Sequence, residues 1–150
     1  MAKKPLSPER KLSAKRKHLR LTLTQLKGLI DSADGNFRHP LAIGPKEEVR
    51  LIVRCKHVNI PECWAMAMLQ HNVRFDGIDY HTTIYKDGSG AQRLGWHRDL
   101  RESDVTVEKV PLPNFNPVTL EQFILDGLAM FNVILEPEGS GGDEQMRIDP

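Results

Sequence analysis

The segment from residue 78 to residue 100, IDYHTTIYKDGSGAQRLGWHRDL, constrains the fold more than any other part of the chain. Two runs in which apolar and polar residues alternate flank a glycine-rich DGSG, which indicates a β-hairpin. Leu94 and Trp96 join the apolar side of the first strand only if Ile84 opposes Leu94. A one-residue slip would expose both side chains and cost about 1.5–3 kcal/mol for each. We therefore predict an even register, in which the numbers of paired residues add up to an even sum.

An even register places His81 and His97 on the same polar face of the hairpin. Two histidines in contact can act as general acid and general base, since each titrates near neutral pH. An arginine beside them, Arg93 or Arg74, could stabilise the charge that builds on a phosphate during RNA cleavage. The same face would carry further polar side chains: Asp79, Tyr85 and Asp99.

We take four of these residues as candidate catalytic residues: His81, Arg93, His97 and Asp99. This set needs no metal and no cofactor, and we expect neither. The same grouping of two histidines and an aspartate could instead bind a divalent transition metal. A plain solvent-facing sheet is a third interpretation, because the polar faces of antiparallel sheets routinely carry such residues.

Further alternating segments predict more strands. Asp76-Gly77 stands between two alternating runs and predicts a second tight turn, with Phe75 opposite Ile78. A helix through PECWAMAMLQ is an alternative for the preceding run, because Ala, Met and Leu favour helices. Residues 105–110 form a proline-bounded strand.

The segment EVRLIVRCKHV alternates clearly and predicts a half-buried strand with a cationic outer side. The expected inward residues are Val49, Leu51, Val53 and Cys55. The expected outward residues are Arg50, Ile52, Arg54 and Lys56.

Helical spacing marks three segments. A helix could begin at Ser7 or Pro8, and a second is expected from about Thr22 to Ala33. The third covers residues 120–135, with Thr119 and Gln122 in a capping-box pattern and an apolar stripe along one side. Residues 36–48 read as a loop.

These elements predict an α+β fold, with a four- to five-stranded, mostly antiparallel meander sheet. An N-terminal helix and a C-terminal helix would pack on one face of the sheet. We expect residues 1–20 to form a basic, partly flexible arm and residues 21–136 a single domain. Residues 137–150 are expected to form an acidic disordered tail.

The net charge of +1 hides an uneven distribution. The first twenty residues hold eight Lys or Arg and one acid, and the last fifteen hold five acids and one Arg. A basic arm can neutralise the phosphates of DNA or RNA without reading sequence, although a merely solvated tail has the same composition. The expected nucleic-acid-binding residues are Lys15, Arg16, Lys17, Arg20, Arg50 and Arg54.

Other features favour a cytoplasmic protein with no membrane partner. The chain has no apolar run near the roughly 18 residues of a spanning helix, and no apolar segment follows the basic start as in a secretory signal. Cys55 and Cys63 have a spacing that suits neither a zinc knuckle nor a disulfide framework, so we expect reduced thiols.

The order YH…KDG…R…WH.D, then a proline-bounded strand and PVTLEQFI, resembles the layout of small TumE-type toxins of toxin–antitoxin systems. The resemblance covers residues 70–130, and its matching positions are His81, Arg93, His97 and Asp99. The family usually shows a denser histidine cluster after the hairpin, which is missing here. The resemblance implies a small intracellular protein that acts on RNA or translation and pairs with an antitoxin.

We therefore expect a nucleic-acid-associated role. Its sharpest form is a toxin-like, metal-independent ribonuclease that uses the cross-strand histidine pair. A non-catalytic module that binds RNA or DNA is one alternative. A protein-interaction or accessory subunit, with a cognate protein partner, is another.

Overall fold

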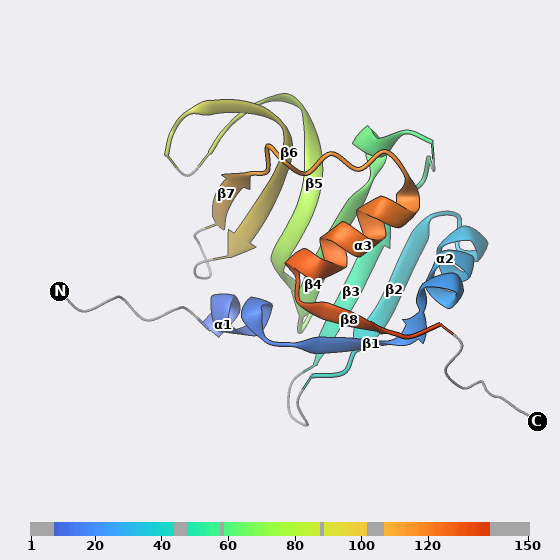
Figure 1. Ribbon diagram of the computed structural model, residues 1–150. Coiled ribbons are helices and arrows are strands. Elements are labelled where there is room, and N and C mark those ends of the chain that lie inside the picture. Colours follow the sequence, from blue (N-terminus) through green and yellow to red (C-terminus); the bar gives the residue numbers. More distant parts are fainter. Residues whose placement is uncertain (1–7, 44–47, 58, 88, 102–106, 139–150) are drawn as a thin grey trace, which may run out of the picture.

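A six-stranded antiparallel sheet forms the centre of the computed structural model, in the order β2-β3-β4-β5-β6-β7 (Figure 1). The structure describes residues 8–43, 48–57, 59–87, 89–101 and 107–138. The strands of the sheet are β2 (Asn36–Leu41), β3 (Val49–Arg54), β4 (Ala65–Gln70), β5 (Val73–Lys86), β6 (Gln92–Arg101) and β7 (Val107–Pro111). The prediction of an α+β fold with a mostly antiparallel sheet is confirmed.

Three helices and a second, two-stranded sheet complete the described chain. The helices are α1 (Pro8–Ala14), α2 (Leu23–Ser32) and α3 (Leu120–Met130), with a short 3-10 helix η1 (Pro61–Cys63) before β4. The second sheet pairs β1 (Lys17–Thr22) with β8 (Val133–Glu136) in parallel. Within the described residues, no helix combines the length and the apolar character needed to cross a membrane.

Helix α3 lies across one face of the large sheet, as Figure 1 shows. Its buried residues, Phe123, Ile124, Gly127 and Leu128, belong to the predicted apolar stripe, whose last residue, Leu135, lies in β8 instead. Gly127 lets the helix come close to the sheet, because a Cβ at that position would lie 3.0 Å from the Met66 side chain. The opposite face of the sheet, called the outer face below, carries the two histidines His81 and His97.

Local sequence signals fix the strands and helices that were predicted correctly. Val49, Leu51 and Val53 are buried and their neighbours point outward, as the alternation indicated. Thr22 caps α2: its hydroxyl accepts from the Gln25 backbone N–H, while the Gln25 side chain accepts from the Thr22 backbone N–H. This reciprocal capping satisfies two backbone donors that a helix start leaves open.

The predicted turn at Asp76-Gly77 is wrong. The chain reverses at His71-Asn72, whose φ angles of 51° and 64° give the left-handed pair of a two-residue hairpin turn. Asp76 and Gly77 lie inside β5, so Phe75 does not oppose Ile78. Met68 pairs with Asp76 and Leu69 with Arg74, which leaves Phe75 as the extra residue of a β-bulge.

One further strand and the end of helix α3 also differ from the prediction. Residues 36–41, expected in a loop, form the edge strand β2, where Pro40 is tolerated because an edge strand needs no second partner. Helix α3 ends at Met130 rather than near residue 135, because Asn132 adopts φ 57° and redirects the chain into β8. The last strand of the sheet, expected from residue 105, is β7, and residues 102–106 lie outside the described part.

Much of the expected basic arm belongs to the fold. Leu12 in α1 and Leu19 in β1 are buried, and β1 pairs with β8 far along the chain. Residues 1–7 of the arm and residues 139–150 of the expected acidic tail lie outside the described residues.

The buried contacts of the Asp76 carboxylate explain why an Asp-Gly pair can lie inside a strand. Its carboxylate is fully buried on the inner face and lies 2.7 Å from Nη2 of Arg98. Ser13 of α1 donates to the same carboxylate and accepts from Arg98 at 3.0 Å. This network attaches α1 to strands β5 and β6.

Replacing Asp76 tests this arrangement. Asp76→Ala leaves the Arg98 guanidinium without its buried partner, and we expect it to lower the free energy of unfolding by about 3 kcal/mol. Urea denaturation measures the change. Asp126→Ala, at an exposed position of α3, is the matched control and should change stability by no more than about 0.5 kcal/mol. A turn at Asp76-Gly77 would make both replacements equally mild.

Candidate functional site

The β5–β6 pairing brings the two histidines together on the outer face. Asp79 pairs with His97, His81 with Gly95 and Tyr85 with Arg93, so the register is even on both sides of an irregularity between His81 and Tyr85. The ring centroids of His81 and His97 are 4.2 Å apart. The prediction that they share a face is confirmed.

The physical reason for this register is only partly the predicted one. Trp96 and Ile78 are buried against α3, as expected. Ile84 and Leu94, however, are 66% and 60% exposed, because the end of the hairpin extends beyond the core. Trp96 and its neighbours therefore fix the register without help from Leu94.

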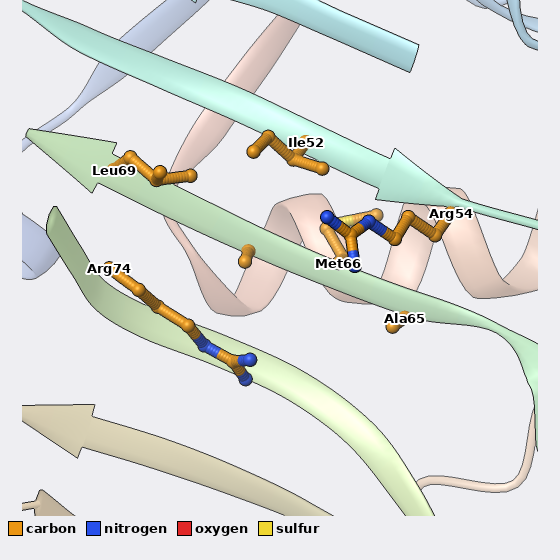
Figure 2. Close-up of a pocket in the computed structure, with 7 residues that line it drawn as sticks. Ile52, Arg54, Ala65, Met66, Leu69 and Arg74 are labelled. Carbon is orange, nitrogen blue, oxygen red and sulfur yellow. The ribbon is translucent and has the colours of Figure 1, made fainter. Parts of the chain in front are cut away.

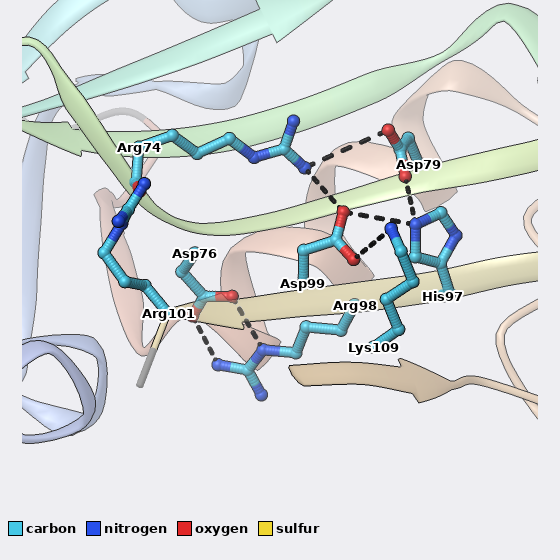
Figure 3. Close-up of polar contacts among 8 residues, drawn as sticks. All are labelled: Arg74, Asp76, Asp79, His97, Arg98, Asp99, Arg101 and Lys109. Carbon is cyan, nitrogen blue, oxygen red and sulfur yellow. Dashed lines mark hydrogen bonds and ion pairs between the residues drawn. The ribbon is translucent and has the colours of Figure 1, made fainter. Parts of the chain in front are cut away.

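His97 belongs to one of the two groups of polar contacts in Figure 3, the group that also contains Arg74, Asp79, Asp99 and Lys109. Its side chain is fully buried, and its Nε2 lies 2.8 Å from Oδ1 of Asp79 and 3.2 Å from Oδ2 of Asp99. Burial opposes a charged imidazole, but the contacts with Asp79 and Asp99 outweigh burial and raise the pKa of His97 to about 9. His97 is therefore protonated at neutral pH.

His81 has the opposite character. It is partly exposed and contacts two other rings, with ring centroids 4.7 Å from Tyr85 and 4.2 Å from His97, which are themselves 4.8 Å apart. Burial, the positive charge of His97 and that of Lys109 all lower the pKa of His81. A neutral, solvent-facing imidazole thus lies against a buried, charged one, and such divergent pairs mark acid–base assignments.

Gly77 leaves the space through which the Arg74 side chain reaches Asp79 and Asp99. The Arg74 guanidinium lies over Gly77, where a Cβ would stand 2.1 Å from it, and its Nη2 reaches Asp99 at 3.5 Å and Asp79 at 3.9 Å. Arg74 was predicted only as the alternative to Arg93 beside the phosphate and was not among the four candidate catalytic residues. The glycine inside a strand was the available signal, because such glycines often mark a close approach of another group.

Arg93, one of the predicted catalytic residues, is not brought to the histidines. Its Nε donates to Asp87 at 2.8 Å at the end of the hairpin, where Asp87 also accepts from Ser89 and Ala91. Arg93 therefore holds the turn. The fourth candidate, Asp99, contacts His97 as described, and Lys109 Nζ lies 3.2 Å from its other oxygen.

The expected phosphate-binding residues divide into two groups. Lys15, Arg16 and Arg20 are exposed, whereas Lys17 is fully buried. The Lys17 ammonium donates to the carbonyl oxygens of Ser13, Lys15 and Phe131 at 2.8, 2.6 and 2.7 Å, and burial lowers its pKa to about 8. Lys17 thus fixes the start of β1 and is not available to a phosphate.

Arg50 and Arg54 are exposed on the outer face, the same face as the histidines. One row of paired residues runs across the sheet from Arg54 through Ala65 and Asp79 to His97. Arg54 and Ala65 of this row, together with Arg74, line a pocket of about 230 Å³ (Figure 2).

Asp79, His81 and His97 could also hold a metal ion, since each offers a ligand atom and these atoms lie within 4.8 Å of one another. Their charges favour a different occupant. Both carboxylates contact the charged His97 and Arg74, and Asp99 also contacts Lys109. A divalent cation would have to displace the His97 proton and approach two further cations, so the arrangement suits an anion better.

Comparisons with protein-family models, with curated proteins and with solved structures found no match for this chain. The resemblance to TumE-type toxins therefore stays a prediction.

The raised pKa of His97 predicts a pH-dependent stability. A folded-state pKa of about 9, above the ordinary 6.5, means that protonated His97 stabilises the fold fully below pH 6.5. The contribution is lost as the pH rises toward 9. Between pH 6.5 and 8 we expect the free energy of unfolding to fall by at most about 1.4 kcal/mol per pH unit. Denaturant titrations at several pH values measure this slope.

The matched variants for this test are His97→Gln, which should remove the slope, and His57→Ala at an exposed position, which should keep it. The window stops at pH 8 because the lowered pKa of Lys17, about 8, adds an opposite slope above that pH. An unchanged slope in His97→Gln would show that another group is responsible.

Proposed function

We propose that the outer face of the sheet binds single-stranded RNA and cleaves its phosphodiester backbone without a metal, with His81 as the general base. The observation that carries the proposal is the 4.2 Å contact between the solvent-facing His81 and the buried His97. A histidine that acts as general base must be neutral at the working pH and open to the substrate, and the lowered pKa and partial exposure of His81 suit this role.

The chemistry requires one proton transfer to His81. His81 takes the proton of the 2′-hydroxyl while the bond from O2′ to phosphorus forms and the bond from phosphorus to O5′ breaks. Water protonates the leaving 5′-oxygen, and His81 returns its proton to the solvent. The products are a 2′,3′-cyclic phosphate and a 5′-hydroxyl, so the reaction consumes no cofactor.

His97 acts through His81 in this proposal. Its side chain is fully buried, so it does not touch the substrate and is a positioning residue rather than a second acid or base. Asp79 and Asp99 hold its ring and keep it charged, and that charge keeps His81 neutral. The proposal thus differs from the sequence-based prediction, in which His81 and His97 act together as general acid and general base.

The net charge of the residues around His97 favours an anionic substrate. Three cations, His97, Arg74 and Lys109, face two carboxylates, those of Asp79 and Asp99, which leaves one net positive charge. Arg50 and Arg54 add exposed positive charge on β3. Positive groups held beside the reacting phosphate stabilise the charge that develops on its oxygens. The resemblance to TumE-type toxins also supports RNA as the target.

Cleavage of a labelled RNA in the presence of EDTA tests the proposal. His81→Ala should lower the rate by about a hundredfold or more, the usual contribution of a general base. His57→Ala, at an exposed position after β3, should leave the rate unchanged. DNA of the same sequence should stay intact, because it lacks the 2′-hydroxyl. Full activity in His81→Ala, or activity that EDTA abolishes, would contradict the proposal.

The pH dependence of cleavage tests the role of His97. The rate should rise with pH as His81 loses its proton, at a pKa below the ordinary 6.5. His97→Gln removes the positive charge that lowers this pKa, so the rising limb should move to higher pH. A purely structural role for His97 would lower the rate at all pH values and leave the limb in place.

A further inference from the structure

We infer that the pocket between Arg54 and Arg74 is a subsite for one base of single-stranded RNA and that it prefers guanine to adenine. The substrate class rests on the proposed function, and the base preference rests on the pocket. The lining residues are Ile52, Arg54, Ala65, Met66, Ala67, Leu69 and Arg74.

The floor of the pocket is flat and apolar. Ala65 and Ala67 of β4 point to the outer face, and Ala67 pairs with Gly77 of β5. The small side chains of Ala65 and Ala67 leave room for a planar ring on β4, and the Arg74 guanidinium, which lies over Gly77, bounds the pocket on the β5 side. The volume of about 230 Å³ is below the roughly 300 Å³ at which pockets for drug-sized ligands begin, and it suits a ligand as small as one base.

The pocket adjoins the histidines. Ala65 pairs with Asp79, and Asp79 pairs with His97, so the floor lies two strands from His97. Neighbouring strands are about 4.8 Å apart, which makes this separation roughly 10 Å. Arg74 belongs to both regions, because it lines the pocket and contacts Asp79 and Asp99. A base in the pocket would therefore belong to a nucleotide next to the cleaved phosphate.

The polar groups of the pocket select the base. Among the described residues that line it, only Arg54 and Arg74 have polar side chains, and a guanidinium only donates hydrogen bonds. Figure 2 shows these two side chains on opposite sides of β4. Guanine presents two adjacent acceptors, N7 and O6, which match the paired N–H groups of an arginine. Adenine presents an acceptor beside a donor, which does not match.

Fluorescence anisotropy with two labelled oligoribonucleotides, UUGUU and UUAUU, tests the inference. Both carry 2′-O-methyl groups, so that they bind without being cleaved. We expect the wild-type protein to bind UUGUU at least about fivefold more tightly, the lower end of what one matched bidentate contact provides.

Two variants separate base recognition from general charge. Arg54→Gln introduces the amide that matches adenine, so the ratio of affinities should fall to about one or reverse. Arg50→Gln changes an exposed arginine on the same strand and face that does not line the pocket. It should weaken both complexes equally and leave the ratio unchanged.

The outcomes distinguish this inference from the proposed function. Equal affinities in the wild type, or a ratio that Arg54→Gln leaves unchanged, would overturn the guanine subsite, even if RNA is cleaved. A guanine preference in a protein that cleaves no RNA would support the subsite and overturn the ribonuclease. Binding of neither oligonucleotide would overturn both.

Discussion

The pairing of β5 with β6 is the constraint on which both polar networks of this protein depend. Successive pairs alternate between the two faces, so Arg98, opposite Ile78, turns inward while its neighbour His97, opposite Asp79, turns outward. The inner network joins Asp76, Arg98 and Ser13 and attaches α1 to the sheet. The outer network surrounds His97. A slip of one residue would exchange the two faces and place both networks among the wrong neighbours.

The outer network shows how a sheet face can hold two histidines in different charge states. A fully buried imidazole would ordinarily lose its proton, but two carboxylates reverse that preference for His97. The resulting charge, together with partial burial, keeps its neighbour His81 neutral. The distinction between a reacting histidine and a positioning histidine thus follows from exposure and from charge rather than from residue type.

The sequence allowed correct predictions where the deciding contacts are local. Alternation gave β3 and the face shared by His81 and His97, helical spacing gave α2, and a capping pattern gave the start of α3. Distant partners explain the errors. Asp76 looks like a turn residue until Arg98, 22 positions away, is known to bind it. The β1–β8 pairing joins segments from opposite parts of the chain, and neither segment carries a signal for its partner.

The candidate site was predictable to a similar extent. The register of β5 and β6 was enough to predict that the histidines and Asp99 share a face. It was not enough to place Arg93, because Asp87 of the hairpin turn binds the Arg93 side chain. Arg74 and the pocket depend on small residues, Ala65, Ala67 and Gly77, whose importance lies in what they leave open. No periodicity marks such residues. The burial of Lys17 shows the same limit, because its carbonyl partners are contributed by backbone that folds around it.

A titration of the histidine side chains by NMR tests the central claim most directly. The resonances of His97 should report a pKa of about 9 and those of His81 a pKa below 6.5, so that only His97 is protonated at pH 7.5. Substitution of each histidine in turn assigns the signals. If both histidines titrate together near 6.5, His97 is not held as a buried cation by Asp79 and Asp99, and the account of the site is contradicted.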